Sequence, residues 1–246
     1  MQNPFIPQKK ANLALISGEA SDEIIKNLNN KGIEVIKTIR VDSVLSEIAF
    51  HPDLILHPIA VNTLVVAPEV FDYYREKLEP YGLEIIKGEN ELGMKYPDDI
   101  KYNVFRIGDH FVHKNGYTDQ TIMTYYEKIG LNLIAVSQGY SKCSIALVDN
   151  HSAITSDIKI AEKLTEVGYD ILLIEKGRVE LPGYEYGFIG GSSGHISSKE
   201  MVFTGSLSKH PDRANIEAFI KNKGIQIIEL SKNSVIDLGT MFFFSI

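Results

Sequence analysis

One short pattern occurs five times along this chain: a glycine followed at once by a short, largely apolar segment. The five glycines are Gly32, Gly82, Gly130, Gly168 and Gly224. A helical pattern comes before each of them, so we interpret the glycine as a helix end and the next residues as a short strand. Self-similarity at a period of roughly 40–55 residues predicts a fold built from repeated supersecondary units.

The helical patterns share a capping or turn-forming start and apolar residues at helical spacing. Residues 68–81, for example, open with Pro68 and place Phe71, Tyr74 and Leu78 on one face. Two short apolar segments joined by a polar turn come before each helix, which indicates a hairpin. The predicted unit is therefore strand, strand, helix, strand. The first strands are expected at residues 48–57, 102–107, 143–148, 186–192 and 235–244.

The fifth unit is divided between the two ends of the chain. Its first strand is expected in residues 235–244 and its remainder in residues 13–36. Pairing of the two ends would leave no open sheet edge, whereas a linear array of repeats would carry polar caps. An ordinary doubly wound sheet is the alternative, but it lacks a hairpin before each helix.

We therefore predict a mixed α/β fold, a five-bladed β/α propeller with pseudo-fivefold symmetry and its helices on the outside. The ring would be closed by pairing of the N- and C-terminal segments. Residues 1–246 are expected to form a single domain. Its repeats are predicted at about 46–90, 98–139, 140–180, 184–232, and 233–246 joined with 12–40.

Charge and cysteine content restrict the expected partners and compartment. The net charge is −7 and there is no long run of lysine or arginine, which argues against nucleic-acid binding. A single cysteine excludes an intramolecular disulfide and fits a reducing compartment. No segment has the roughly 18 apolar residues of a membrane span, and residues 1–12 lack a signal-peptide pattern. We expect a cytoplasmic protein without nucleic-acid or membrane partners, and the sequence leaves the oligomeric state open.

The repeat plan over residues 12–246 resembles that of the pentein superfamily, the fold of guanidine-modifying enzymes (GME fold). Its members include arginine and agmatine deiminases, dimethylarginine hydrolase and glycine amidinotransferase. The resemblance implies amidinotransferase-like or deiminase-like chemistry. In such enzymes a cysteine attacks the guanidinium carbon, a histidine acts as general acid and base, and carboxylates hold the cation.

Two of these groups are missing from the places where the resemblance puts them. The cysteine belongs to the first strand of the last repeat, but residues 235–241 contain none. The histidine belongs to the first strand of the third repeat, but residues 140–145 contain none. The aspartate of the first repeat is matched by Asp53 within residues 50–57, whereas Asn103 replaces the carboxylate of the second repeat.

Asp53 and His57 stand four residues apart on a predicted strand, so both should point to the same side. They are either a carboxylate and base facing the axial cavity or a buried pair that holds the ring together. Cys143 lies beside Lys142, which could lower the pKa of the thiol. Neighbours on a strand face opposite sides, however, and a free cysteine is commonly a core residue.

The glycine-rich run 187–194 lacks the Gly-Lys-Ser/Thr ending of a phosphate loop. Gly190 and Gly191 either let the backbone approach the axis closely or offer N–H groups to an anion. The acidic loop 91–99 is either solvated or covers one mouth of the ring. Three other histidines lie in or near turns without metal-ligand spacing: His110, His113 and His151. No metal and no cofactor is expected.

The leading hypothesis is a non-catalytic or catalytically divergent pentein-fold protein that binds a small polar molecule or a protein partner at the axial mouth. The expected ligand-binding residues are Asp53, His57, Asn103, Cys143, Gly190, Gly191 and Thr240. The alternative is a hydrolase or amidinotransferase acting on arginine-like or amidine substrates, with Cys143 as nucleophile and His57 with Asp53 as its base pair. A third possibility is an interaction module without a small ligand.

Overall fold

The computed structural model describes residues 2–246 and shows five separate three-stranded sheets, not one closed sheet. In each sheet the second strand lies in the middle, antiparallel to the first strand and parallel to the third. Four sheets follow chain order: β3 (Leu56–Ala60), β4 (Thr63–Val66) and β5 (Glu84–Lys87); β6 (Phe105–Ile107), β7 (His110–Lys114) and β8 (Asn132–Val136); β9 (Ile145–Asp149), β10 (Ser152–Thr155) and β11 (Asp170–Leu173); β12 (Ser193–Ser197), β13 (Glu200–Phe203) and β14 (Gln226–Glu229).

The fifth sheet joins the two ends of the chain, as the divided fifth repeat predicts. It consists of β15 (Phe242–Phe244), β1 (Leu13–Ile16) and β2 (Glu34–Lys37), with Ala14 opposite Phe243 in the antiparallel pair. The pairing buries all three phenylalanines of β15 in the core. The two terminal segments therefore hold each other in place.

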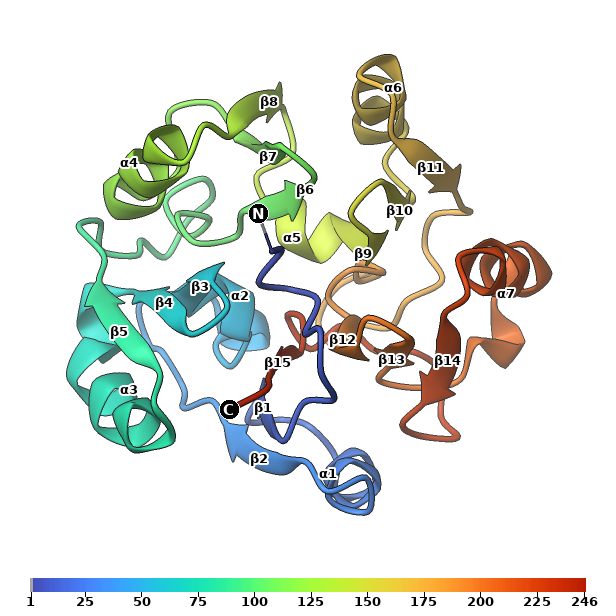
Figure 1. The fold of residues 1–246 in the computed structure, drawn as a ribbon, viewed down its shortest axis with the longest axis horizontal. Helices are drawn as coiled ribbons and strands as arrows, with labels where there is room; N and C mark the ends of the chain where they lie inside the picture. The colour runs from blue at the N-terminus through green and yellow to red at the C-terminus, as the bar shows by residue number, and fades with distance from the viewer. Residues whose placement is uncertain (1) are drawn as a thin grey trace.

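A helix connects the second and third strands of every sheet. These helices are α1 (Asp22–Asn29), α3 (Phe71–Leu78), α4 (Gln120–Lys128), α6 (Ile158–Glu166) and α7 (Arg213–Asn222). Figure 1 shows them at the periphery, while the first strand of each sheet lies nearest the centre. Two four-residue helices, α2 (Pro52–Ile55) and α5 (Ser141–Ser144), precede β3 and β9. Short 3-10 helices are η1 (Ser46–Ile48), η2 (Pro68–Val70), η3 (Glu79–Tyr81) and η4 (Leu207–Lys209).

The repeated glycines have a conformational cause. All five that follow the helices have φ between 70° and 95°, a region that L side chains rarely adopt. No atom lies within 4 Å of a Cβ placed at Gly32, Gly82, Gly130 or Gly168, so space is not the constraint. The interpretation of these glycines as helix ends is confirmed, and the strand, strand, helix, strand unit is present in all five sheets.

The first strands of the repeats differ from their predicted ranges. Of the expected strand 48–57, only the last two residues belong to a strand, β3. Residues 52–55 form helix α2, because Pro52 suits a first helical position and Asp53 suits the positive helix end. The expected strand 143–148 likewise begins with helix α5. The prediction that Asp53 and His57 share one strand is therefore wrong.

Two further first strands begin later in the chain than the predicted ranges. The segment 186–192 is an irregular, glycine-rich loop, and β12 begins at Ser193. Only Phe242–Phe244 of the expected strand 235–244 pairs as β15. In the second repeat β6 covers Phe105–Ile107 of the expected 102–107. The short helices and loops that precede the first strands carry the polar residues of the candidate site.

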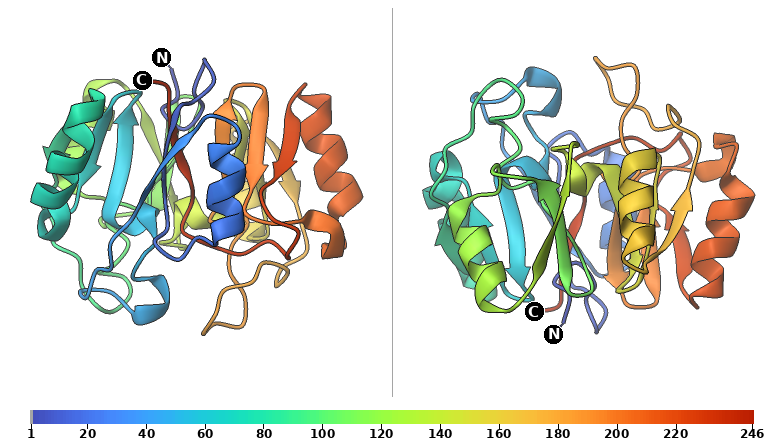
Figure 2. Two further views of the ribbon diagram at one scale, coloured as in Figure 1. Left: turned by 90° about the horizontal axis from the view of Figure 1, so that it is seen from below. Right: turned by 90° about the horizontal axis from the view of Figure 1, so that it is seen from above.

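Apolar clusters fill the space between sheets and helices, but the centre of the molecule contains buried polar residues. Both termini lie at one end of the molecule, and the loop before β12 projects from the other end (Figure 2). Among the described residues, no helix is long and apolar enough to cross a membrane.

Candidate functional site

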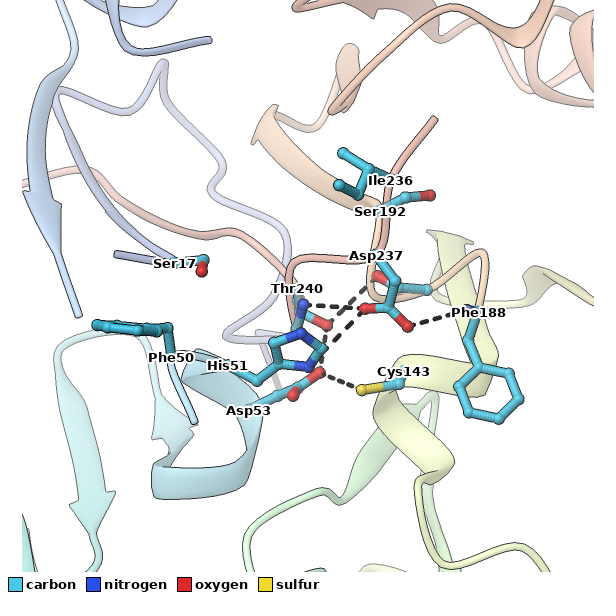
Figure 3. Close-up of polar contacts among 12 residues, drawn as sticks. Ser17, Phe50, His51, Asp53, Cys143, Phe188, Ser192, Ile236, Asp237 and Thr240 are labelled. Carbon is cyan, nitrogen blue, oxygen red and sulfur yellow. Dashed lines mark hydrogen bonds and ion pairs between the residues drawn. The ribbon is translucent and has the colours of Figure 1, made fainter. Parts of the chain in front are cut away.

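A cavity of about 560 Å³ lies between Ile48, Tyr96 and residues 181–188, whose loops lie away from the termini. Its innermost lining residues are His51, Cys143 and Asp237, each at most 3% exposed. Figure 3 shows these three side chains, with Asp53 and Thr240, directed toward one another from separate segments. The cavity therefore ends on a buried cluster of ionisable groups.

Cys143 belongs to the short helix α5, and two polar side chains hold its sulfur. The thiol donates to Asp53 Oδ2 at 3.0 Å, and Asn103 Nδ2 donates to Sγ at 3.2 Å. Asn103 Oδ1 in turn accepts from the backbone N–H groups of Lys142 and Cys143, which fixes the amide. Burial raises the pKa of Cys143 well above its usual value, and the nearby carboxylates raise it further. The thiol is therefore protonated at neutral pH, despite its neighbour Lys142.

Asp53 lies in α2 and connects the thiol to the C-terminal segment. Its Oδ2 also accepts from Thr240 Oγ1 at 2.7 Å, and Lys142 Nζ donates to the same Thr240 oxygen at 3.3 Å. Thr240 has φ 67°, a strained conformation for a β-branched residue. Asp53 is fully buried, its Oδ1 has no hydrogen-bond partner among the described residues, and burial raises its pKa.

Asp237 is held by the backbone. Its Oδ1 accepts from the N–H of Gly239 at 2.9 Å and its Oδ2 from the N–H of Phe188 at 2.8 Å. Burial raises its pKa to about 6, although the two N–H donors and the charge of Lys142 act in the opposite direction. A Cβ at Gly191 would come within 1.8 Å of Asp237 Oδ1, so only glycine leaves room for this carboxylate.

His51 precedes α2 and faces Asp237, with 4.0 Å between Nδ1 and Oδ1. Burial lowers its pKa, so the imidazole is neutral at pH 7. His51, Asp53 and Cys143 place one ligand atom each within 4.8 Å of one another. Nitrogen, oxygen and sulfur donors in this number suit a transition-metal ion such as Zn²⁺. His51 and Asp53 are two residues apart, but Cys143 lies 90 residues beyond Asp53, so the sequence shows no metal-ligand spacing.

The structure brings most of the residues expected at the site together. Asp53, Asn103, Cys143 and Thr240 form the hydrogen-bonded cluster described above. His57 is an exception, because it lies in β3 and bonds through Nε2 to the hydroxyl of Tyr126 at 2.6 Å. Burial lowers the pKa of His57 to about 3. The expected pairing of His57 with Asp53 is wrong, and His51 is the histidine beside that aspartate.

The two candidate glycines support the cluster through close backbone packing. A Cβ at Gly190 would lie 2.4 Å from the carbonyl oxygens of Lys142 and Ile145. The N–H of Gly191 donates to the carbonyl of Cys143 at 2.9 Å, so this group is not free to bind an anion. Close approach, rather than anion binding, is the reading that these contacts favour.

Three residues of the cluster were not among the candidates: His51, Lys142 and Asp237. A signal for Asp237 existed, since it is an ionisable residue in the segment where the resemblance expects the nucleophile. His51 and Asp53 flank Pro52, and this tripeptide opens helix α2. Lys142 adjoins the only cysteine. Their convergence depends on contacts between distant segments, which the sequence pattern does not show.

The sequence of the chain matches a family of unknown function, DUF6873, over residues 15–242. The chain belongs to this family. No curated protein matches its sequence. Among solved structures, it is similar to the inosamine-phosphate amidinotransferase from Streptomyces griseus, with a TM-score of 0.59, 10% identity, and coverage of 98% of this chain and 93% of that one.

Two further structures are similar over nearly the whole chain. A DDAH mutant from Pseudomonas aeruginosa complexed with citrulline has a TM-score of 0.56, 10% identity, and coverage of 91% of this chain and 93% of that one. Agmatine deiminase from C. jejuni has a TM-score of 0.55, 12% identity, and coverage of 95% and 94%. These are pentein-fold guanidine-modifying enzymes, so the resemblance in fold is confirmed. Identities this low show the fold alone.

Proposed function

We propose that the cavity over His51, Cys143 and Asp237 binds a small organic cation that carries an amidine or guanidine group. The observation behind this proposal is the Asp237 carboxylate, which two backbone N–H groups fix at the inner end of the cavity. Its only salt-bridge contact within the described residues is the 4.0 Å approach of His51. A planar cation offers paired N–H donors to such a carboxylate.

The charges of the cluster favour the same ligand. Burial raises the pKa values of Asp53 and Asp237 and lowers that of Lys142, so the cluster disfavours its own charged forms, and a bound cation would favour the ionised carboxylates. All three side chains are nearly or fully buried, and an uncompensated buried charge is costly. A bound cation would balance it. The protein partner and the ligand-free interaction module remain alternatives that no feature of this cluster favours.

The position of the cavity follows from a finer description of the fold, which we also propose. The five sheets would form a five-bladed propeller with pseudo-fivefold symmetry, because all share one strand order and Figure 1 places them around one centre. The pair β1–β15 would close the ring. The cavity is then the mouth of the axis that lies away from the chain termini.

Covalent chemistry on the bound cation is the second candidate function. Cys143 lines the cavity, Asp53 Oδ2 accepts its thiol proton at 3.0 Å, and a nitrogen of His51 lies within 4.8 Å. The thiol proton would pass to Asp53 while sulfur adds to the amidine carbon, and the departing amine would take that proton. A positive ligand beside the sulfur would favour the thiolate, which burial and the nearby carboxylates disfavour.

Calorimetric titration with benzamidine, against its neutral analogue benzamide, tests cation binding. We expect benzamidine alone to bind, and Asp237→Asn to weaken it by about tenfold or more. Asp157→Asn is the matched control, because Asp157 also lines the cavity and asparagine keeps its helix N-cap. The control should weaken benzamidine binding far less than Asp237→Asn does. Equal affinity for benzamidine and benzamide would contradict the proposal.

Ammonia release and intact protein mass test the second candidate. The probe is agmatine, a guanidine without a carboxylate, which corresponds to the name of one of the similar enzymes. If Cys143 is a nucleophile, Cys143→Ser should abolish release and any covalent adduct while cation binding persists. If the wild type binds the cation without turnover, the covalent function is rejected and cation binding remains the proposed function.

A further inference from the structure

The walls of the cavity are aromatic. The aromatic residues that line it are Tyr96, Tyr140, Tyr184, Tyr186 and Phe188. The ring centroids of Tyr96 and Tyr140 lie 5.6 Å apart, and those of Tyr186 and Phe188 lie 6.3 Å apart. Such walls stabilise an apolar or flat ligand body and attract a positive charge over the ring faces.

The only charged residues that line the cavity, besides the neutral His51, are acids: Asp157, Glu185 and Asp237. No lysine or arginine of the described residues lines it. Two lysines lie nearby and pack over aromatic rings of the wall. The Nζ atom of Lys114 lies 4.6 Å from the ring centroid of Tyr96, and that of Lys176 lies 4.8 Å from the ring centroid of Tyr186.

A carboxylate inside the cavity would therefore have acids, and no lysine or arginine, among its lining residues. Ser137, Gln138 and Tyr184 are lining residues that offer neutral hydrogen-bond donors. Neutral donors do not offset the cost of placing a negative charge beside Asp237 in a partly desolvated space.

We propose that the cavity selects organic cations with an apolar or aromatic body and rejects those that carry a carboxylate. The ligand class is then an amine or amidine without an acidic group, and free amino acids are excluded. This inference rests on the proposed function, since it assumes that Asp237 holds the positive end. It adds a requirement on the rest of the ligand, which must be apolar or aromatic and carry no acidic group.

Three compounds separate the effect of the ligand's negative charge on affinity from the effect of its size: benzamidine, 4-amidinobenzoate and methyl 4-amidinobenzoate. The ester is larger than the acid but carries no negative charge. By calorimetry we expect the ester to bind within a few-fold of benzamidine and the acid to bind more weakly by about tenfold or more. Equal affinity for acid and ester would overturn the inference. Weak binding of both, with benzamidine retained, would also overturn it, because size would then be the cause.

Ser137→Arg provides a gain-of-binding test. Ser137 is exposed at the cavity and its side chain has no hydrogen bond among the described residues, so the substitution should leave the fold intact. The new guanidinium should improve binding of 4-amidinobenzoate and leave the ester unchanged. An unchanged preference in a folded variant would count against the inference. If none of the three compounds binds the wild type, the proposed function itself fails, a result distinct from failed selectivity.

Tyr184→Ala tests the aromatic wall separately. Tyr184 is 43% exposed, so its loss should disturb packing little. We expect several-fold weaker binding of benzamidine and the same preference for ester over acid. Unchanged benzamidine affinity would show that the wall does not contact the ligand.

Discussion

The thiol of Cys143 donates a hydrogen bond to Asp53, with 3.0 Å between Sγ and Oδ2, although 90 residues separate the two in the sequence. The contact joins the short helices α2 and α5, which precede the first strands of two different sheets. The thiol keeps its proton, because burial and the neighbouring carboxylates both disfavour the thiolate. The resting site is therefore suited to receive a positive charge.

Cys143 should be slow to react with alkylating reagents in the native state. Burial and the carboxylates raise the pKa of its thiol, and the side chain is 3% exposed. We expect little alkylation by iodoacetamide between pH 5 and 9, and ordinary reactivity in urea with a midpoint near 8.5. Asp53→Asn should accelerate the native reaction by removing a neighbouring negative charge. A fast native reaction with a midpoint below 8.5 would contradict this account.

Binding of an organic cation should strengthen as pH rises through about 6, the pKa to which burial raises Asp237. The ligand prefers the ionised carboxylate, so affinity falls when Asp237 is protonated and levels off above its pKa. Burial lowers the pKa of His51, which faces Asp237, so a positive charge on this imidazole is disfavoured. Benzamidine titrations from pH 5 to 8 test this, and Asp237→Asn should flatten the profile. A flat wild-type profile would exclude Asp237 as the anchor.

Gly191→Ala should destabilise the protein by about 1–3 kcal/mol, the usual cost of overpacking. The three atoms nearest to the added Cβ all belong to the Asp237 side chain, which its two backbone donors hold in place. Asp237→Ala in the same chain should remove most of this cost. Urea unfolding of the two single variants and the double variant measures the coupling. Additive effects would mean that Gly191 does not make room for Asp237.

Phe243→Ala should cost about 3–5 kcal/mol, because this side chain is buried where β15 pairs with β1. Ile246→Ala is the control, since Ile246 is 46% exposed and its loss should change stability by about 0.5 kcal/mol or less. Deletion of residues 235–246 should leave an insoluble chain with exposed sheet edges. A soluble monomer with native circular dichroism would show that the terminal strand is dispensable.

Local constraints made part of the fold predictable from the sequence. The glycines that end the helices must adopt positive φ, and that requirement is visible at each position. Helices of eight residues or more are long enough to show apolar residues at helical spacing, and α1 also begins after a capping residue, Ser21. The four-residue helices α2 and α5 are too short for any periodicity, so the sequence pattern predicts strands there.

The candidate site was only partly predictable for the same reason. Asp53, Asn103 and Thr240 fell in the segments where the family resemblance directs attention, and the structure brings them together. The misread strand paired Asp53 with His57, although the histidine that lies beside it is His51. Asp237 contacts His51 and the loop at Phe188, which are distant in the sequence. The spacing of residues along the sequence does not reveal such contacts.

A crystal structure with benzamidine tests the central claim most directly, because it locates the cation. We predict its amidinium group at the inner end of the cavity, within hydrogen-bond distance of the Asp237 carboxylate, with its ring between the aromatic walls. Benzamidine bound elsewhere, or an empty cavity at saturating ligand, would contradict the assignment of this cavity as an organic-cation site.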